Sequence, residues 1–223
     1  MQHTLISPMT ANAKLGKGVA TSYRPVGDSA KGNGTCPSSC PLLPENGGKC
    51  YTRKFLVNNQ QRNSWERNDP LDRFLEKGAK YVRLHTSGDF FCAGRNGSYV
   101  LNVPYLQSVV EWVKGYPEVT VWTYTHDVSK LIDEGYSYKN GSFSENLHIV
   151  ASCDTIEGKD LATSHGFRTA RVIDNKEEKL PDETFCPYDL SLHDGMKPTT
   201  NCKDCTLCFN PKHKKNIAFL KQK

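Results

Sequence analysis

Residues 69–89 read DPLDRFLEKGAKYVRLHTSGD and predict a helix that leads directly into a strand. Asp69 is a favoured helix cap, Pro70 suits the first helical position, and Gly78 suits the position just past the helix end. The run that follows, AKYVRLHTSGD, is rich in β-forming residues. A helix joined to a strand by so short a turn is typical of folds in which helices cross over between parallel strands.

The same helix-then-strand order returns three more times. Tyr105, Val109, Trp112 and Val113 lie at helical spacing in the first of these repeats. The helices are expected at 103–117, 128–135 and 156–166, the strands after them at 118–127, 146–154 and 167–174, and an earlier strand around 18–23. The pattern predicts an α/β fold with a parallel sheet. With about five strands the chain favours a partial β/α barrel, and an open doubly wound sheet is the alternative.

The alternation of helix and strand stops at residue 175. We therefore expect residues 1–174 to form the partial barrel, including an N-terminal loop of cysteines. Residues 175–223 are expected to form a loop-rich, cysteine-containing extension that ends in a basic PKHKK segment and a short helix-like end.

Composition and charge exclude some classes of protein. The chain has 223 residues, enough to bury a sizeable core, and a formal net charge of +5. No apolar run approaches the roughly 20 residues that span a bilayer, and no secretory signal pattern is present. We expect a cytoplasmic protein without membrane partners. The mildly basic charge is weak evidence for nucleic-acid binding.

Seven of the nine cysteines form two groups at opposite ends of the chain. The first group is Cys36, Cys40 and Cys50, and the second is Cys186, Cys202, Cys205 and Cys208. Cytosolic thiols stay reduced, so such groups indicate metal ligands rather than disulfides. Three ligands and four ligands are the numbers expected for one open metal site and one closed site.

The spacing of the second group favours an iron–sulfur cluster. Its C-x2-C-x2-C run, with a distant cysteine followed by proline, matches iron–sulfur ligand sets better than the paired C-x2-C of zinc sites. The first group, C-x3-C-x9-C, is less standard. The alternatives left open are one cluster or two, structural zinc at either group, and a site shared by both groups. Cys92 and Cys153 have no partners by spacing and are expected to be ordinary thiols.

An acidic residue stands near the end of four predicted strands: Asp89, Asp127, Asp154 and Asp174. The carboxyl ends of parallel strands share one face, where active sites of α/β folds lie. Helix capping is a better explanation than a role in a site for Asp127 and Asp174. The two explanations are equal for Asp154, and capping explains Asp89 less well. His85 and His126 lie among apolar strand neighbours, where a histidine is more often a core residue than a ligand.

The order of these motifs resembles a family of uncharacterised phage-encoded proteins, and a phage-encoded protein would be expected in the host cytoplasm. The motifs are CPSSCP with its later CY, then RLHTSGDFF, TVWTYTH and the carboxy-terminal cysteine run, and they cover about residues 16–208. That family is in turn similar to reduced radical S-adenosylmethionine (radical SAM) proteins. The resemblance implies a radical-SAM-like partial β/α barrel with a three-cysteine loop after the first strand. The loop departs from the usual radical SAM spacing, in which two residues precede the third cysteine.

The resemblance also implies roles for particular residues. Cys36, Cys40 and Cys50 would hold a [4Fe-4S] cluster whose open iron chelates S-adenosylmethionine, and the four later cysteines would hold an auxiliary cluster. The segment that contains Ser87, Gly88 and Asp89 corresponds to the part that contacts the methionine moiety, and Tyr51 to the aromatic residue beside the third ligand. Asp89 and Asp154 are the candidates for contacts to methionine or ribose.

Three functions follow as hypotheses. The first is an iron–sulfur enzyme of the radical SAM type that acts on an unknown substrate. The second is a non-catalytic module, stapled by iron–sulfur clusters or zinc, that binds a host protein or nucleic acid. Its phosphate contacts would come from Arg53, Lys54, Arg62, Arg67, Lys212, Lys214 and Lys215. The third is an electron-transfer protein with two clusters and no substrate.

Overall fold

The computed structural model describes residues 5–7, 12–48, 50 and 78–221. The helix predicted from residue 69 and the polar segment at 51–67 lie outside the described residues. No helix in the described part of the chain combines the length and the apolar character needed to cross a bilayer.

One mixed α/β sheet organises the molecule. Its strand order is β1-β2-β3-β6-β7-β8-β10-β9, and every neighbouring pair is parallel except β1 with β2. The strands are β1 (Leu5–Ser7), β2 (Ala20–Tyr23), β3 (Tyr81–Arg83), β6 (Thr120–Thr125), β7 (Leu147–Ser152), β8 (Arg168–Ile173), β9 (Glu183–Phe185) and β10 (Asn216–Leu220). The predicted parallel sheet is therefore confirmed. Among the described residues the edge strands β1 and β9 do not pair, so no barrel closes.

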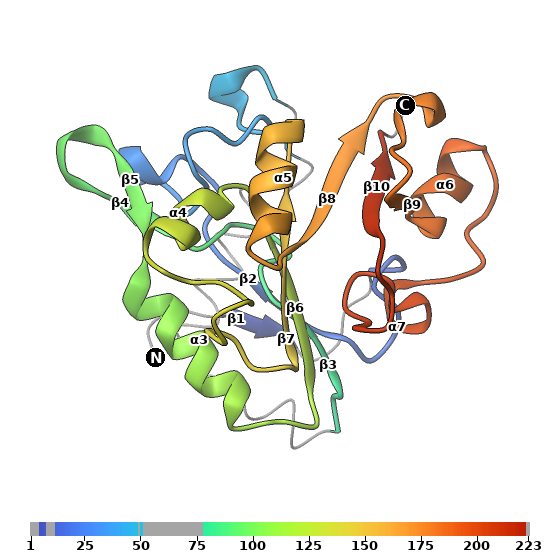
Figure 1. Ribbon diagram of the computed structural model, residues 1–223, viewed down its shortest axis with the longest axis horizontal. Coiled ribbons are helices and arrows are strands. Elements are labelled where there is room, and N and C mark those ends of the chain that lie inside the picture. Colours follow the sequence, from blue (N-terminus) through green and yellow to red (C-terminus); the bar gives the residue numbers. More distant parts are fainter. Residues whose placement is uncertain (1–4, 8–11, 49, 51–77, 222–223) are drawn as a thin grey trace.

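Helices connect the central strands as the sequence pattern predicts. The helices are α3 (Val103–Lys114), α4 (Val128–Asp133), α5 (Ile156–Ser164), α6 (Pro187–His193) and α7 (Cys202–Cys205). A two-stranded hairpin of β4 (Phe91–Ala93) and β5 (Tyr99–Leu101) precedes α3. Figure 1 shows α3, α4 and α5 on one side of the molecule, with α6 and α7 beside β9 and β10 on the other.

The helix α3 shows why the sequence pattern works. The Asn102 side chain accepts a hydrogen bond from the backbone N of Tyr105, Pro104 lies in the first turn, and Gly115 follows the last residue. The apolar residues at helical spacing are all buried against the sheet. Burial of this apolar face, rather than helix propensity alone, stabilises a helix of 12 residues.

The central strand β6 buries both of its faces. Val121 packs in the core beneath α3, α4 and α5, whereas Trp122 packs on the opposite face against Phe209 from the carboxy-terminal tail. The residues of a strand alternate between faces, so β6 contributes to two separate apolar clusters. A strand buried on both faces is expected for a parallel sheet covered on both sides.

The carboxy-terminal tail is more regular than the sequence pattern suggests. The expected helix-like end is wrong, because residues 216–220 form β10, which inserts between β8 and β9. Residue 174 therefore does not separate two sheets: both β9 and β10 continue the sheet of the preceding residues. In the run NIAFL four consecutive apolar residues follow Asn216, which is the composition of a buried parallel strand.

Candidate functional site

The loop between β2 and β3 carries the first cysteine group, and its described part up to residue 48 is held by its own hydrogen bonds. The Asp28 carboxylate accepts hydrogen bonds from the Ser38 hydroxyl and from a backbone N in the 3-10 helix η1 (Ser29–Lys31). The Cys36 backbone N donates to the Gly27 carbonyl (3.0 Å). The Asn46 amide donates to the Ser38 carbonyl (2.7 Å). A loop that the sequence predicts as irregular thus holds its cysteines through its own hydrogen bonds.

The segment Ser87–Asp89, called the SGD segment, packs directly on the start of this loop. The Arg24 backbone N donates to the Ser87 carbonyl (2.9 Å), and the Asp89 backbone N donates to Thr35 Oγ1 (3.0 Å). Gly88 has φ +76°, and a Cβ at this position would lie 2.5 Å from Thr35 Oγ1 and 2.8 Å from the Arg24 carbonyl oxygen. Only glycine fits this close approach without displacing backbone.

These contacts bring the first cysteine group and the SGD segment into one pocket. The pocket is lined by Val26, Cys36, Cys40, Leu42, Leu43, Cys50, Arg83, His85, Ser87, Gly88, Asp89, Tyr124 and His126. It therefore contains all three cysteines together with Ser87, Gly88 and Asp89. It lies beside the carboxyl ends of β3 and β6, where the topology of a parallel sheet places binding sites.

Asp89 ties the SGD segment to the end of β6. One carboxylate oxygen accepts a hydrogen bond from the Phe90 backbone N (2.8 Å), and the other accepts one from the His126 backbone N (2.9 Å). The residue is buried, and burial raises its pKa. Because both oxygens hold backbone groups, the first role of Asp89 is to position the wall of the pocket.

Burial disfavours free thiolates in the first pocket. Burial, with Asp89 and the other cysteines nearby, raises the pKa of Cys36 to about 12 and that of Cys40 to about 11. Such thiols keep their protons at neutral pH unless a cation replaces them. The donor set is therefore suited to a metal or cluster that supplies positive charge.

His85 lines the same pocket but is held by the core. Its Nε2 lies 2.7 Å from the Tyr105 hydroxyl and its Nδ1 lies 3.2 Å from Thr123 Oγ1. Its ring contacts Phe90 edge-on, and its backbone adopts the left-handed region at φ +50°. With both ring nitrogens engaged, His85 matches the expectation of a satisfied core histidine.

The buried His85 should make stability depend on pH. Burial, assisted by Arg24 and Arg83, lowers the pKa of His85 well below its usual value. The unfolded chain binds a proton at this histidine below about pH 6.5, and the folded chain does not. The contribution of His85 to the free energy of unfolding is therefore complete above about pH 6.5 and is lost as the pH falls.

We expect this histidine to lower the free energy of unfolding by up to ~1.4 kcal/mol per pH unit below about pH 6. His85→Asn should flatten the slope, because asparagine tolerates the left-handed backbone and does not titrate. Urea unfolding between pH 7 and pH 5 measures both slopes. Equal slopes in the wild type and the variant would contradict this assignment.

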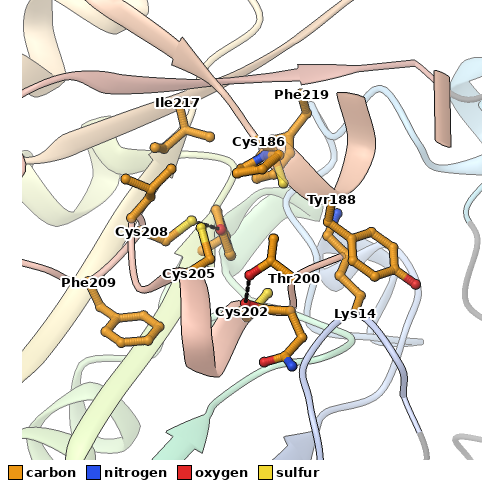
Figure 2. A pocket seen from close by; sticks show the side chains of 14 residues that line it. Lys14, Cys186, Tyr188, Thr200, Cys202, Cys205, Cys208, Phe209, Ile217 and Phe219 are labelled. Carbon is orange, nitrogen blue, oxygen red and sulfur yellow. Dashed lines mark hydrogen bonds between the residues drawn. The ribbon is translucent and has the colours of Figure 1, made fainter. Parts of the chain in front are cut away.

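The second cysteine group lines a separate pocket on the face of the sheet opposite α3. The pocket is lined by Lys14, Tyr124, Cys186, Pro187, Tyr188, Thr200, Asn201, Cys202, Cys205, Leu207, Cys208, Phe209, Ile217 and Phe219. Figure 2 shows the side chains of all four cysteines around this one space. The structure thus brings together residues that lie 22 positions apart in the sequence, from Cys186 to Cys208.

Several contacts hold the cysteine segment against the sheet. The Phe209 ring lies 4.6 Å from the Trp122 ring, centroid to centroid. The Arg168 guanidinium donates hydrogen bonds to three backbone carbonyls of the segment, including that of Asn210 (2.9 Å). Asn201 caps the short helix α7, and its side chain accepts a hydrogen bond from the Asp204 backbone N (3.1 Å).

The second pocket also disfavours free thiolates. Burial, with Cys208 nearby, raises the pKa of Cys202 to about 12, and burial raises that of Cys186 to about 11. The Lys14 ammonium lies at the edge of this pocket, where it forms an ion pair with Asp189 (2.7 Å). One buried and three partly buried thiols around one pocket again form a donor set that a cation would stabilise.

The cysteines of the two pockets are not arranged around a single ion. Within residues 5–7, 12–48, 50 and 78–221, no group of three or more His, Cys, Asp or Glu side chains is placed to hold one metal ion.

The other predicted site residues lie elsewhere. Tyr51 lies outside the described residues. Asp154 is exposed and lines neither pocket, and Thr155 rather than Asp154 caps α5. Asp127 accepts hydrogen bonds from the hydroxyls of Ser129 and Tyr99. Asp174 forms an ion pair with Lys221 at the surface. Cys92 and Cys153, which have no partners by spacing, line neither pocket.

The pocket residues that sequence reasoning missed include three with charged or polar groups near the thiols. Arg83 and Tyr124 line the first pocket, and Tyr124 and Lys14 line the second. A charged residue inside the apolar run YVRL was a usable signal, because buried parallel strands rarely carry charge. Nothing in the local pattern distinguishes Lys14, because its neighbours in space come from the other end of the chain.

Comparison with known proteins gives one match. A family model described as Gene product 88 matches residues 8–221, nearly the whole chain. No curated protein and no solved structure matches the chain. The family match supports the expected phage-encoded family, and the comparisons show no likeness to radical SAM proteins.

Proposed function

The chain belongs to the Gene product 88 family, and we propose that it is an iron–sulfur protein with two cysteine-bound clusters. The observation that carries the proposal is the sorting of seven cysteines into two separate pockets, three in one and four in the other. Cysteines that serve only in packing behave as small apolar side chains. Such a role does not require them to lie together in two pockets.

The first pocket is suited to a [4Fe-4S] cluster with one open iron. Cys36, Cys40 and Cys50 supply three thiols, and three thiolates leave the fourth iron without a protein ligand. Arg83 and His126 line the same pocket and offer hydrogen-bond donors beside the thiols. Asp89 holds the backbone N of His126 and so keeps this wall in place.

We further propose that the first site binds S-adenosylmethionine, as in radical SAM proteins. When bound, the cluster would supply the electron that cleaves this cofactor. The order β2-β3-β6-β7-β8 supports a radical-SAM-like partial barrel, because consecutive strands lie side by side without the reversal of a doubly wound sheet. Ser87 and Gly88 line the pocket next to the cysteines, where contacts to a methionine group would form.

Anaerobic purification followed by iron, sulfide and zinc assays tests the proposal. We expect a brown protein with about eight iron and eight sulfide per chain, falling to about four of each when the first three cysteines are changed to alanine. Spin resonance should then respond to S-adenosylmethionine in the wild type and not in that variant. A loaded protein with no such response, and no 5′-deoxyadenosine after reduction, would refute the cofactor proposal.

A zinc-stapled binding module is the second candidate, and the enclosure of the second pocket favours it there. The four cysteines lie among Phe209, Ile217 and Phe219, as in a closed structural site. Lys212, Lys214 and Lys215 are exposed in the loop after Cys208 and could contact phosphates. A colourless protein with stoichiometric zinc, and nucleic-acid binding that weakens steeply with salt, would establish this function instead.

A further inference from the structure

Tyr124 lies in the wall between the two cysteine pockets. Of the residues that the structure describes, it alone lines both of them. It belongs to β6, and its side chain lies on the face opposite α3, the same face as that of Trp122 two residues earlier. The position follows from strand alternation, because Val121 and Thr123 face the helices and Tyr124 faces the cysteine segment.

The two ends of this side chain make different contacts. The Tyr124 hydroxyl donates a hydrogen bond to the sulfur of Cys208 (3.0 Å). The Arg83 guanidinium lies over the Tyr124 ring, 4.4 Å from its centroid. Arg83 is itself buried and lines the first pocket. A continuous chain of contacts therefore runs from the first pocket through Arg83 and Tyr124 to a cysteine of the second.

Each contact in this chain responds to charge. A hydrogen bond to a ligand sulfur stabilises the more negative state of the group that the sulfur holds, and so raises its reduction potential. A guanidinium over an aromatic face interacts with the ring electrostatically, more strongly where water is excluded. In such surroundings neighbouring polar contacts polarise one another, so a change of charge beside Arg83 alters the hydrogen bond at Cys208.

We propose that Tyr124 couples the two cysteine sites. Its hydroxyl sets the properties of the group bound at the second site, and its contact with Arg83 makes those properties depend on what the first site holds. Tyr124 is thus a positioning residue that acts through Cys208 and Arg83. The proposal rests on the proposed function in that both pockets hold a metal group.

The first test is the reduction potential of the second site in Tyr124→Phe. This variant keeps the ring beneath Arg83 and removes only the hydroxyl. We expect unchanged iron and sulfide and a shift of the second-site potential to a more negative value, followed by spin resonance during redox titration. Tyr138→Phe is the matched control, because its buried hydroxyl bonds to β7 away from both pockets. An unchanged potential in Tyr124→Phe overturns the proposal.

The second test is a mutant cycle that measures the coupling itself. Emptying the first site with Cys36→Ala, Cys40→Ala and Cys50→Ala should shift the second-site potential when Tyr124 is present. The same change in the Tyr124→Phe background should produce a smaller shift, since the hydrogen bond that transmits it is gone. Equal shifts in the two backgrounds would show that Tyr124 transmits nothing.

The coupling can also be tested if the iron–sulfur proposal fails. If the protein holds zinc rather than iron, cobalt(II) replaces zinc and the thiolate-to-cobalt absorption band replaces the potential. We expect Tyr124→Phe to move this band to lower energy, because a thiolate without its hydrogen bond donates charge more readily, and the same cycle applies. An unmoved band, or a chain that takes up neither metal, overturns the coupling.

Discussion

The double change Cys205→Ser and Cys208→Ser is expected to empty the second cysteine site and to lower the free energy of unfolding by about 4 kcal/mol. That value is the stabilisation from a ligand present at about 1,000 times its dissociation constant. If the second site holds a metal as proposed, the segment should depend on it, because α7 has only four residues and the loops around it lack regular structure. Without a metal, the contacts of Phe209 with Trp122 and of Arg168 with the loop carbonyls must hold it alone.

Metal assays, thermal unfolding and limited proteolysis check this expectation. Bound iron per chain should fall by the amount that the second site holds. New proteolytic cleavage should concentrate between residues 196 and 215. Cys92→Ser is the matched control, because Cys92 is partly exposed and lines neither pocket. If the double variant keeps its metal and its stability, the second group is not a ligand set.

The regular part of the fold was predictable because its signals are local. In α3 the cap at Asn102, the proline and the apolar spacing lie within one segment. Strands β6, β7 and β8 each appear in the sequence as a run with β-branched residues after a helix. The tail misled because β10 is a short strand that depends on pairing with β8 and β9, contacts that no local pattern reveals.

The thiols of the candidate site and the segment Ser87–Asp89 were predictable from the sequence, but the strand residues that line its walls were not. Cysteines have few roles in a reduced compartment, so their spacing carries information without a structure. Arg83 and Tyr124 gain their roles from β3 and β6 lying side by side, which the sequence implies only through the sheet order. Asp89 is the intermediate case: the sequence marks it as unusual, but its hydrogen bond to the backbone of His126 requires the fold.

Asp89→Ala is the second large expected effect, and it should damage the first site selectively. Removing the carboxylate leaves the buried backbone N–H groups of Phe90 and His126 without their acceptor. Each unsatisfied buried group costs about 1–3 kcal/mol, so we expect a loss of roughly 2–6 kcal/mol in the free energy of unfolding. The same change releases the SGD segment from the end of β6, so metal should be lost from the first site before the second.

Asp89→Asn separates positioning from charge. Its amide oxygen can still accept one of the two backbone hydrogen bonds, so we expect about half the loss of stability and partial retention of first-site metal. Urea unfolding and iron assays on the wild type, Asp89→Asn and Asp89→Ala rank the three proteins by stability and by first-site metal content. Asp154→Ala is the control, because this exposed carboxylate lines neither pocket. If Asp89→Asn loses first-site metal completely while its stability matches the wild type, the negative charge of Asp89 acts on the bound group directly, and its backbone hydrogen bonds are secondary.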